Sequence, residues 1–488
     1  MTHTIHNRSA INAEPITETS DAQTNADSQQ TLDARLAALD LTDVGNAARL
    51  VARYGHDLRY SHAEQKWYVW DGIRWAAESS NKKVQNLAVQ TAVAMYGEAA
   101  TVPLEVLLPG TNKRRCDALA AHGQKTQNQA RLRAMIAMAA LHESVAVQPE
   151  ELDADPWLLN LQNGTLGLAM GTLRPHRRED LLTRLAPVAF DPDADCPTWR
   201  AFLERVQPDG AVRGYVQRAA GYTLTGDTRE QCLFLLLGGG ANGKSTFTEI
   251  VSTILGSYYV KTRAQTLTSH GAGVPNDVAA LAGRRLVSVA ELSEGQRLAE
   301  GLVKDLTGQD RLVARFLFKE FFEFVPSAKI WLYGNHVPTI QGTDNGIWRR
   351  IKLIPFAVTI PESEQDRTLL AKLRAELPGI LNWLVEGCLA WQAGGLGQPV
   401  SITEAVQQYR ADMDTIAQFL AMMCLTGPEA RVKARALYQA YRRWCADQGT
   451  ASQSQIILGK RLREKGFTQT KNSAMEWHGL GLMDADPE

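Results

Sequence analysis

The chain has 488 residues, of which 44% are hydrophobic and 22% charged, with a formal net charge of -1. Its length exceeds what one hydrophobic core serves and predicts about three domains. The near-neutral charge excludes a global basic field, so nucleic acid would be bound only through a local stripe or pore. Without a membrane-length apolar run or a signal peptide, a cytoplasmic protein is expected. Six cysteines without a Cys-x-x-Cys pair indicate buried free thiols, not a zinc ribbon.

The first part of the chain changes from polar to aromatic. Residues 1–30 are rich in Thr, Asn, Ala, Ser and Gln, which predicts a disordered leader. Apolar residues recur at helical spacing over 32–54 and indicate a helix that stops at Gly55. An antiparallel meander is expected over 58–75, turned at Asp71-Gly72. Its tryptophans either stack on nucleobases or form a small core, and we favour the core because strand aromatics usually pack.

Helices and then strands are expected before the next boundary. Residues 81–146 are typical of helices with a basic break at 113–115, and 158–190 of strands. The segment 191–197 is typical of a linker, and a helix is expected over 199–224. Together these segments predict a mixed α+β domain.

A run of five apolar residues, Leu233–Leu237, leads directly into a glycine-rich segment. The spacing of Gly238, Gly243, Lys244 and Ser245 is the P-loop pattern, and the helical pattern that follows supplies the strand-loop-helix context. The glycines let backbone amides surround phosphate oxygens, Lys244 would reach the β- and γ-phosphates, and the Ser245 hydroxyl would bind Mg²⁺. The candidate nucleotide-binding residues are Gly238, Gly239, Gly240, Ala241, Asn242, Gly243, Lys244, Ser245 and Thr246.

Two later apolar strands end in polar residues. The strand over 285–290 ends in Glu291, an acid that would lie across the magnesium from Ser245. Glu291 would contact the metal or polarise the attacking water, and Glu294 could share either task. The strand over 329–334 ends in Asn335, whose amide can orient water or read the γ-phosphate without adding charge.

Two adjacent arginines, Arg349 and Arg350, precede the apolar run 351–355. An arginine in this place can neutralise transition-state charge on the nucleotide of a neighbouring subunit. The alternative is a simple solvent-facing basic pair.

The order of these motifs resembles superfamily 3 helicases, the ring-forming AAA+ motors, and within them the phage and plasmid primase-helicase family related to the poxvirus primase-helicase. The resemblance covers most of the chain after about residue 45. It rests on the segments 239–246, 281–291, 306–310, 314–319, 334–338 and 347–350. It implies a hexamer with ATP between subunits, in which Glu291 and Asn335 act in cis and Arg349 or Arg350 acts in trans.

The resemblance also implies a DNA-gripping hairpin before the asparagine strand. The segment 316–324 alternates apolar and polar residues around Lys319, which is therefore the candidate DNA-binding residue. The alternative is a lysine that merely shields a strand edge. Family members often carry a primase domain ahead of the helicase, and the residues before the meander are too few for one. We therefore expect priming to come from a separate polypeptide.

The carboxy-terminal segment resembles a winged helix. Its basic residues either contact duplex phosphates, or belong to a protein-docking or plain solvated helix. They are Lys460, Arg461, Arg463, Lys465 and Lys471.

These interpretations predict an α/β protein with an AAA+-type core. The expected parts are a disordered leader 1–30, a mixed α+β domain 31–198, an ATPase domain 199–395 and a helical, winged-helix-like domain 396–488. The function expected is that of an ATP-dependent replicative helicase on single-stranded and forked DNA, serving a phage, plasmid or integrated element in the bacterial cytoplasm. One rival is an ATP-regulated replication initiator or loader without unwinding activity. Another is a small-molecule phosphotransferase, which would lack DNA-stimulated ATP hydrolysis.

Overall fold

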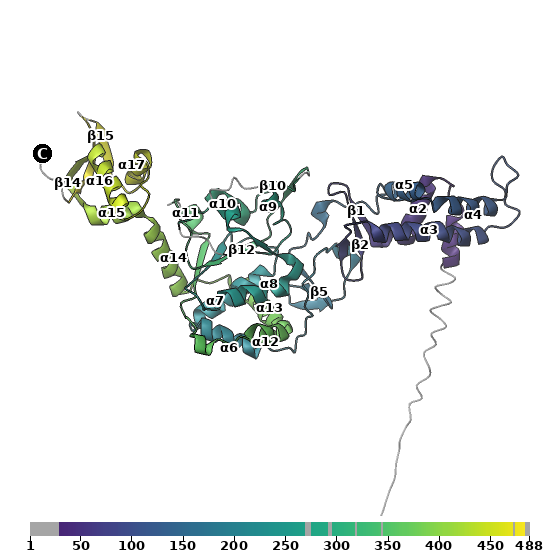
Figure 1. The fold of residues 1–488 in the computed structure, drawn as a ribbon, viewed down its shortest axis with the longest axis horizontal. Helices are drawn as coiled ribbons and strands as arrows, with labels where there is room; N and C mark the ends of the chain where they lie inside the picture. The colour runs from purple at the N-terminus through teal and green to yellow at the C-terminus, as the bar shows by residue number, and fades with distance from the viewer. Residues whose placement is uncertain are drawn as a thin grey trace, which may run out of the picture. The chain divides into compact units, whose positions relative to one another are not determined.

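The structure, a computed structural model, describes residues 29–268, 275–290, 295–317, 320–342, 345–471 and 474–483. Contacts divide the chain into two compact units, whose elements Figure 1 labels. The first comprises Met1–Ala154 and His176–Arg184, and the second comprises Asp155–Pro175 and Leu185–Glu488. Within the described ranges, no helix is long and apolar enough to cross a membrane. Residues 1–28 of the predicted leader lie outside these ranges.

The first unit is mainly helical. Its helices surround a core to which Leu50, Met95 and Leu119 contribute. The prediction of one helix over 32–54 is wrong, because Thr42 begins a new helix by accepting a hydrogen bond from the Gly45 amide at 3.1 Å. The helices are α2 (Asp43–Tyr54), α3 (Lys82–Ala100), α4 (Arg115–Thr126) and α5 (Gln129–Ala139).

The predicted aromatic meander is present as an antiparallel sheet in the order β1-β2-β3. Trp67 and Trp75 are buried, and the Trp75 indole donates to the Arg178 carbonyl at 2.9 Å. For these two tryptophans the core interpretation is therefore confirmed. The strands are β1 (Leu58–Ser61), β2 (Lys66–Trp70) and β3 (Trp75–Ala77).

The second unit is organised around a parallel sheet in the order β13-β7-β12-β9-β8. Its strands are nearly continuous apolar runs, as expected for a sheet covered on both faces. The strands are β7 (Leu233–Leu237), β8 (Tyr259–Thr262), β9 (Leu286–Ala290), β12 (Lys329–Gly334) and β13 (Ile351–Pro355).

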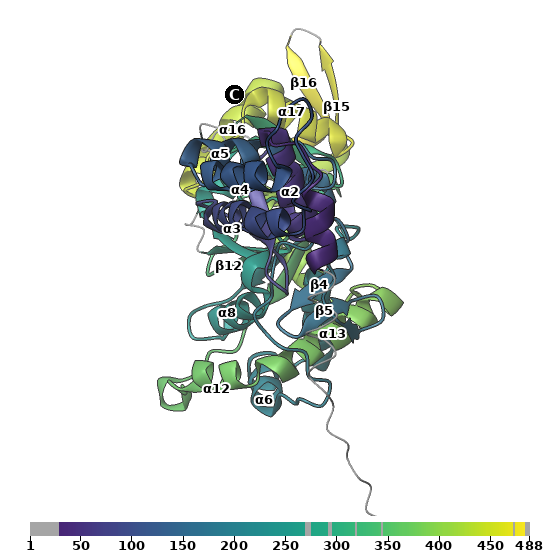
Figure 2. The ribbon, with the colours of Figure 1, turned by 90° about the vertical axis from the view of Figure 1, so that its right-hand side faces the viewer.

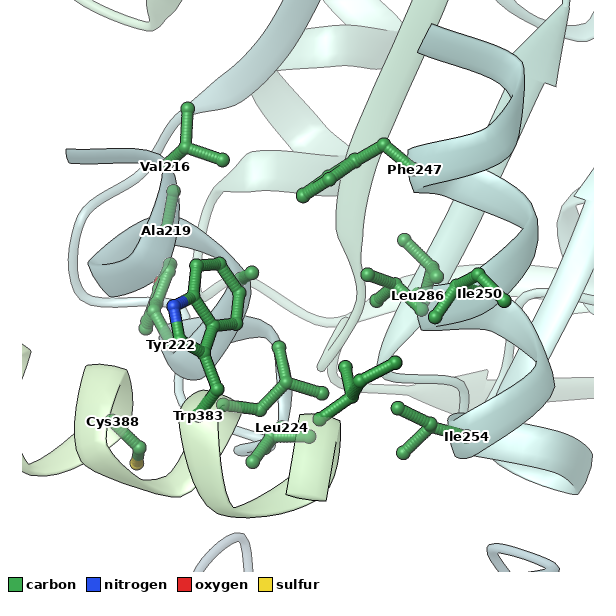
Figure 3. Close-up of a cluster of buried hydrophobic side chains, with 14 of the residues drawn as sticks. Val216, Ala219, Tyr222, Leu224, Phe247, Ile250, Ile254, Leu286, Trp383 and Cys388 are labelled. Carbon is green, nitrogen blue, oxygen red and sulfur yellow. The ribbon is translucent and has the colours of Figure 1, made fainter. Parts of the chain in front are cut away.

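Alternate strand residues enter two hydrophobic clusters, one on each face of the sheet. On one face, α8 (Lys244–Leu255) points Phe247, Ile250 and Ile254 toward two further helices (Figure 3). Those helices are α7 (Gly210–Thr223) and α13 (Leu377–Gly394). The opposite face is covered by α10 (Glu300–Thr307), α11 (Asn345–Trp348) and α14 (Val400–Met413). Helices thus pack against both faces of the sheet.

The helix predicted over 199–224 is two helices, α6 (Pro197–Val206) and α7. Pro208 cannot continue a helix, and Asp209 caps α7 by accepting a hydrogen bond from the Ala211 amide at 2.8 Å. This break brings the end of α6 against the glycine-rich loop after β7.

Among the described residues, the second unit also contains three smaller antiparallel sheets, one of which is the two-stranded sheet of β10 (Leu312–Arg315) and β11 (Phe321–Phe324). Of the strands predicted over 158–190, those up to Arg174 are present as a sheet in the order β4-β5-β6, and residues 175–190 form no strand. The carboxy-terminal sheet has the order β14-β16-β15, and Figure 2 labels β15 and β16. Strand β14 was not among the predicted elements; its pairing with β16 shifts register between Thr426 and Arg431, on either side of Gly427-Pro428. These elements are β4 (Leu158–Leu161), β5 (Gly164–Gly167), β6 (Thr172–Arg174), α15 (Thr415–Met423), β14 (Cys424–Lys433), α16 (Ala434–Asp447), α17 (Gln455–Glu464), β15 (Thr468–Lys471) and β16 (Met475–Leu482).

All six cysteines are free and buried, which confirms the prediction of structural thiols. Burial raises the pKa of Cys232 to about 12 and those of Cys196 and Cys388 to about 11. The thiolate form is therefore scarce at neutral pH.

Candidate nucleotide-binding site

The glycine-rich loop 238–243 joins β7 to α8, as the P-loop pattern predicts. Packing requires glycine at two of its positions. A Cβ on Gly238 would lie 2.2 Å from the Phe356 carbonyl oxygen, and one on Gly243 would lie 2.7 Å from a Val206 methyl group. Gly243 also has a φ of +86°, which disfavours other residues.

The two middle glycines have a different environment. A Cβ on Gly239 or Gly240 would meet no atom within 4 Å, so both face open space. The amide groups that begin α8 are oriented along its axis toward the loop. The loop therefore presents backbone to open space at a helix start, which suits an anion such as a phosphate.

Lys244, the first residue of α8, is only 5% exposed. Its ammonium donates to the Gly238 carbonyl at 2.7 Å and to the Asn242 side-chain oxygen at 2.9 Å. Burial lowers the pKa of Lys244, because desolvation disfavours the charged form. Ser245 follows in the first turn of α8 and is exposed. The lysine thus lies inside the loop, held by neutral oxygens that an anion can replace.

The neighbouring strands end beside this loop. Gly334, the last residue of β12, is paired with Leu237, so Asn335 follows directly at the same edge of the sheet and is exposed. On the other side of β12, Tyr333 is paired with Ala290, the last residue of β9. The structure thus brings Asn335 to the loop. Glu291 and Glu294 lie outside the described residues.

The two arginines lie at the opposite edge of the sheet. Ile351 is paired with Leu233 and Pro355 with Leu237, so Arg349 and Arg350 precede the amino edge, about 13 Å or more from the loop along β13. The structure therefore does not bring either arginine to the loop of its own chain.

The two arginines also differ in environment. Arg349 is exposed, and its guanidinium donates to the Gln231 side-chain oxygen at 2.9 Å. Arg350 is 8% exposed and donates to the Thr307 hydroxyl at 3.1 Å and to the Gly346 carbonyl at 2.6 Å. The interpretation of a solvent-facing basic pair is therefore wrong for Arg350, because tertiary contacts bury it.

The hairpin expected before the asparagine strand is present, and it starts earlier than predicted. Strand β10 (Leu312–Arg315) pairs antiparallel with β11 (Phe321–Phe324). Lys319 lies outside the described residues. Sequence reasoning missed Arg315, whose guanidinium lies 4.8 Å over the ring of Phe321, itself 60% exposed. Arg315 is the one charged residue of β10, whose sequence is Leu-Val-Ala-Arg, and a charge at the end of an apolar strand could have indicated it.

Three family models match separate parts of the chain. Residues 47–208 match the model described as "D5 N terminal like", and 411–478 match "Poxvirus D5 protein-like". Residues 236–350, which contain the loop and both arginines, match a family of unknown function (DUF5906).

Curated relatives are viral proteins. A predicted helicase of Acanthamoeba polyphaga mimivirus is 28% identical over 319 residues, which cover 60% of this chain and 33% of that protein. A predicted helicase of Frog virus 3 is 26% identical over 386 residues, covering 61% of this chain and 40% of that protein. A predicted primase of African swine fever virus is 26% identical over 213 residues, covering 42% of this chain and 22% of that protein.

The chain thus spans between about a fifth and two fifths of the length of these relatives. Among solved structures, the apo structure of the NrS-1 C-terminal region aligns with a TM-score of 0.48 and 11% identity. That alignment covers 87% of this chain and 95% of the other.

Proposed function

The chain belongs to the D5-like family of primase-helicases, and on this premise we propose that it is an ATP-dependent replicative DNA helicase that translocates on single-stranded DNA as a ring. It would serve a phage, plasmid or integrated element in the bacterial cytoplasm, with a separate primase as a further partner. Viral relatives named for helicase and primase roles support a role in replication.

The observation that supports this proposal best is the loop 238–243 with Lys244 inside it. In open α/β sheets ligands bind beyond the carboxyl ends of the strands, which is where this loop lies. A triphosphate fits there because Gly239 and Gly240 leave room for its oxygens against the backbone, and Lys244 supplies positive charge. The loop-bearing strand has a parallel neighbour on each side, as an AAA+-type core requires.

The chain's own residues would divide the chemistry of ATP hydrolysis. Lys244 would bind the β- and γ-phosphates, and Ser245 with Glu291 would hold Mg²⁺. Bound Mg²⁺ supplies positive charge that neutralises the phosphate oxygens. Glu291, with Glu294 as the alternative, would accept a proton from the attacking water, and Asn335 would orient that water from the end of β12.

We assign the role in trans to Arg349. The arginines and the loop lie at opposite edges of one sheet, so an arginine that acts on a bound nucleotide would act on that of another subunit. Arg349 is exposed and can give up its hydrogen bond to Gln231 at small cost. Arg350 would instead fix the turn before β13 through its buried hydrogen bonds. A closed hexameric ring would pair one such arginine with one loop at every seam.

DNA would be held by the hairpin and by the carboxy-terminal elements. Lys319, which lies between β10 and β11 in the sequence, remains the candidate for contact with the DNA backbone. The elements α15, β14, α16, α17, β15 and β16 have the order expected of a winged helix. The exposed basic residues of α17 would contact duplex phosphates at a fork.

The test compares the wild-type protein with Lys244→Ala in two assays, ATP hydrolysis with and without single-stranded DNA and unwinding of a forked duplex. We expect hydrolysis that DNA stimulates, unwinding that requires ATP, and loss of both in Lys244→Ala. Hydrolysis without unwinding would support the initiator or loader instead. Hydrolysis that DNA does not change, by a monomer, would contradict both readings and favour a small-molecule phosphotransferase.

A further inference from the structure

The side chain of Asn242 lies at the centre of the glycine-rich loop and is 4% exposed. Its nitrogen donates to the Gly239 carbonyl and to the Phe356 carbonyl, each at 3.2 Å. Its oxygen accepts the hydrogen bond from the Lys244 ammonium at 2.9 Å. One amide therefore joins the lysine, the loop and a segment more than a hundred residues away.

The chemistry of the partners fixes the orientation of this amide. Both carbonyls can only accept hydrogen bonds, and the ammonium can only donate. Exchanging the oxygen and nitrogen of Asn242 would oppose like groups at all three contacts. Aspartate, which has no donor, cannot reproduce this arrangement, although it has the same shape.

The backbone on either side directs Asn242 inward. Ala241 and Gly243 have φ values of +50° and +86°, and the Ala241 carbonyl accepts a hydrogen bond from the Ile360 amide at 2.7 Å. The loop is thus tied to the segment after β13 by backbone and by the Asn242 side chain together. Gly239 and Gly240, in contrast, face open space. The open side of the loop, where a phosphate would bind, is therefore not the side to which the Asn242 side chain points.

Phe356, the distant partner of Asn242, is held in place by its surroundings. Phe356 is 1% exposed, belongs to the core of the second unit, and donates its amide to the Leu237 carbonyl at 2.7 Å. It directly follows β13, the strand that begins after Arg350. The hydrogen bond from Asn242 consequently connects the loop to the strand that leads back to the two arginines.

We propose that Asn242 is a positioning residue that acts through Lys244: its amide holds the ammonium at the floor of the loop until phosphate oxygens replace it, and its tie to Phe356 keeps the loop in register with β13. This inference rests on the proposed ATPase function and deepens it. In this role only the backbone of Asn242 belongs to the phosphate cradle. A neutral amide suits the task, because a carboxylate would compete with phosphate for the lysine.

The experiment measures the Kd of Mg²⁺-ATP, by displacement of a fluorescent ATP analogue, together with kcat and KM. It compares the wild-type protein with Asn242→Ala and Asn242→Asp. Aspartate keeps the shape but pairs its charge with the ammonium, so we expect ATP binding to weaken by about tenfold or more. We expect a smaller loss for Asn242→Ala, which adds no charge. A purely structural role would instead appear as a loss of thermal stability that accounts for the loss of binding, because aspartate also opposes the Gly239 and Phe356 carbonyls.

The matched control is Gln207→Met. Gln207 is also a buried amide, and it donates to the Pro355 carbonyl at 2.8 Å, next to Phe356, whereas the Lys244 ammonium donates to Gly238 and Asn242. We expect its KM for ATP to stay near that of the wild type. In a Lys244→Met background, Asn242→Asp should cause no further loss of binding, because the charge on which it acts is gone.

The outcomes separate this inference from the proposed function. Wild-type protein that neither binds nor hydrolyses ATP overturns both. Two results, each with normal wild-type turnover, overturn the inference alone. One is ATP binding that neither Asn242→Ala nor Asn242→Asp changes. The other is a loss of binding from Asn242→Asp that is as large in the Lys244→Met background as in the wild type. Thermal unfolding without nucleotide checks that each variant folds. If Asn242→Asp does not fold, a fall in kcat/KM confined to Asn242→Ala supports the inference, and an equal fall in Gln207→Met refutes it.

Discussion

Replacing Arg349 and Arg350 by methionine, one at a time, should separate catalysis in trans from stability. Arg350→Met removes hydrogen bonds to the Thr307 hydroxyl at 3.1 Å and the Gly346 carbonyl at 2.6 Å in a site that is 8% exposed. Each buried bond from a charged donor contributes about 1.5 to 3 kcal/mol, and methionine restores part of the packing. We therefore expect the free energy of unfolding to fall by about 3 kcal/mol.

Arg349→Met should have the opposite profile. Its exposed guanidinium makes one hydrogen bond, to Gln231, so the free energy of unfolding should change by less than about 0.5 kcal/mol. An arginine that neutralises transition-state charge contributes about a thousandfold or more to kcat. DNA-stimulated hydrolysis should therefore fall by about that factor while the protein remains folded.

Urea denaturation followed by tryptophan fluorescence measures stability, and steady-state hydrolysis with single-stranded DNA measures turnover. Mixing Arg349→Met with Lys244→Met subunits should restore part of the activity, because some seams then combine an intact loop with an intact arginine. Arg349→Met protein that hydrolyses ATP at the wild-type rate would refute the role in trans. Wild-type stability of Arg350→Met would refute its role as an anchor.

Two further substitutions test the packing. Gly238→Ala places a Cβ 2.2 Å from the Phe356 carbonyl oxygen and should cost about 2 to 4 kcal/mol, whereas Gly239→Ala, whose Cβ meets no atom within 4 Å, should leave the Tm unchanged in thermal unfolding. Glu98→Gln neutralises a buried carboxylate that accepts from two buried arginines at 2.7 and 2.8 Å, and should cost about 3 to 5 kcal/mol in urea denaturation. The exposed Glu105→Gln is its control, and equal stabilities of the two variants would contradict the ion-pair account.

The loop could be predicted because its signal is local. An apolar strand, a glycine-rich turn and a helix occupy consecutive residues, and each requires its own residue types. The position of Asn335 also followed, because the ends of parallel strands meet at one edge. The break between α6 and α7 had a visible signal, Pro208, that outweighs the helical periodicity around it.

Other features depend on contacts between distant residues. The burial of Arg350 is set by Thr307 and Gly346, and sequence spacing does not show which of two adjacent arginines turns inward. The role inferred for Asn242 depends on Phe356, which is a neighbour only after β13 has paired with β7. Sheet order is a long-range property, and local patterns do not contain it.

Because all six cysteines are buried, alkylation of a thiol reports local opening of the fold around it. Cys116 lies in the first unit, while Cys232 and Cys388 lie in the second, so iodoacetamide can reach each only when its surroundings separate. Peptide mass spectrometry after timed labelling would therefore measure the alkylation rate of the cysteines in each unit from one sample. Adding a nucleotide should slow the alkylation of Cys232 and Cys388 in the second unit and leave the alkylation rate of Cys116 in the first unit unchanged.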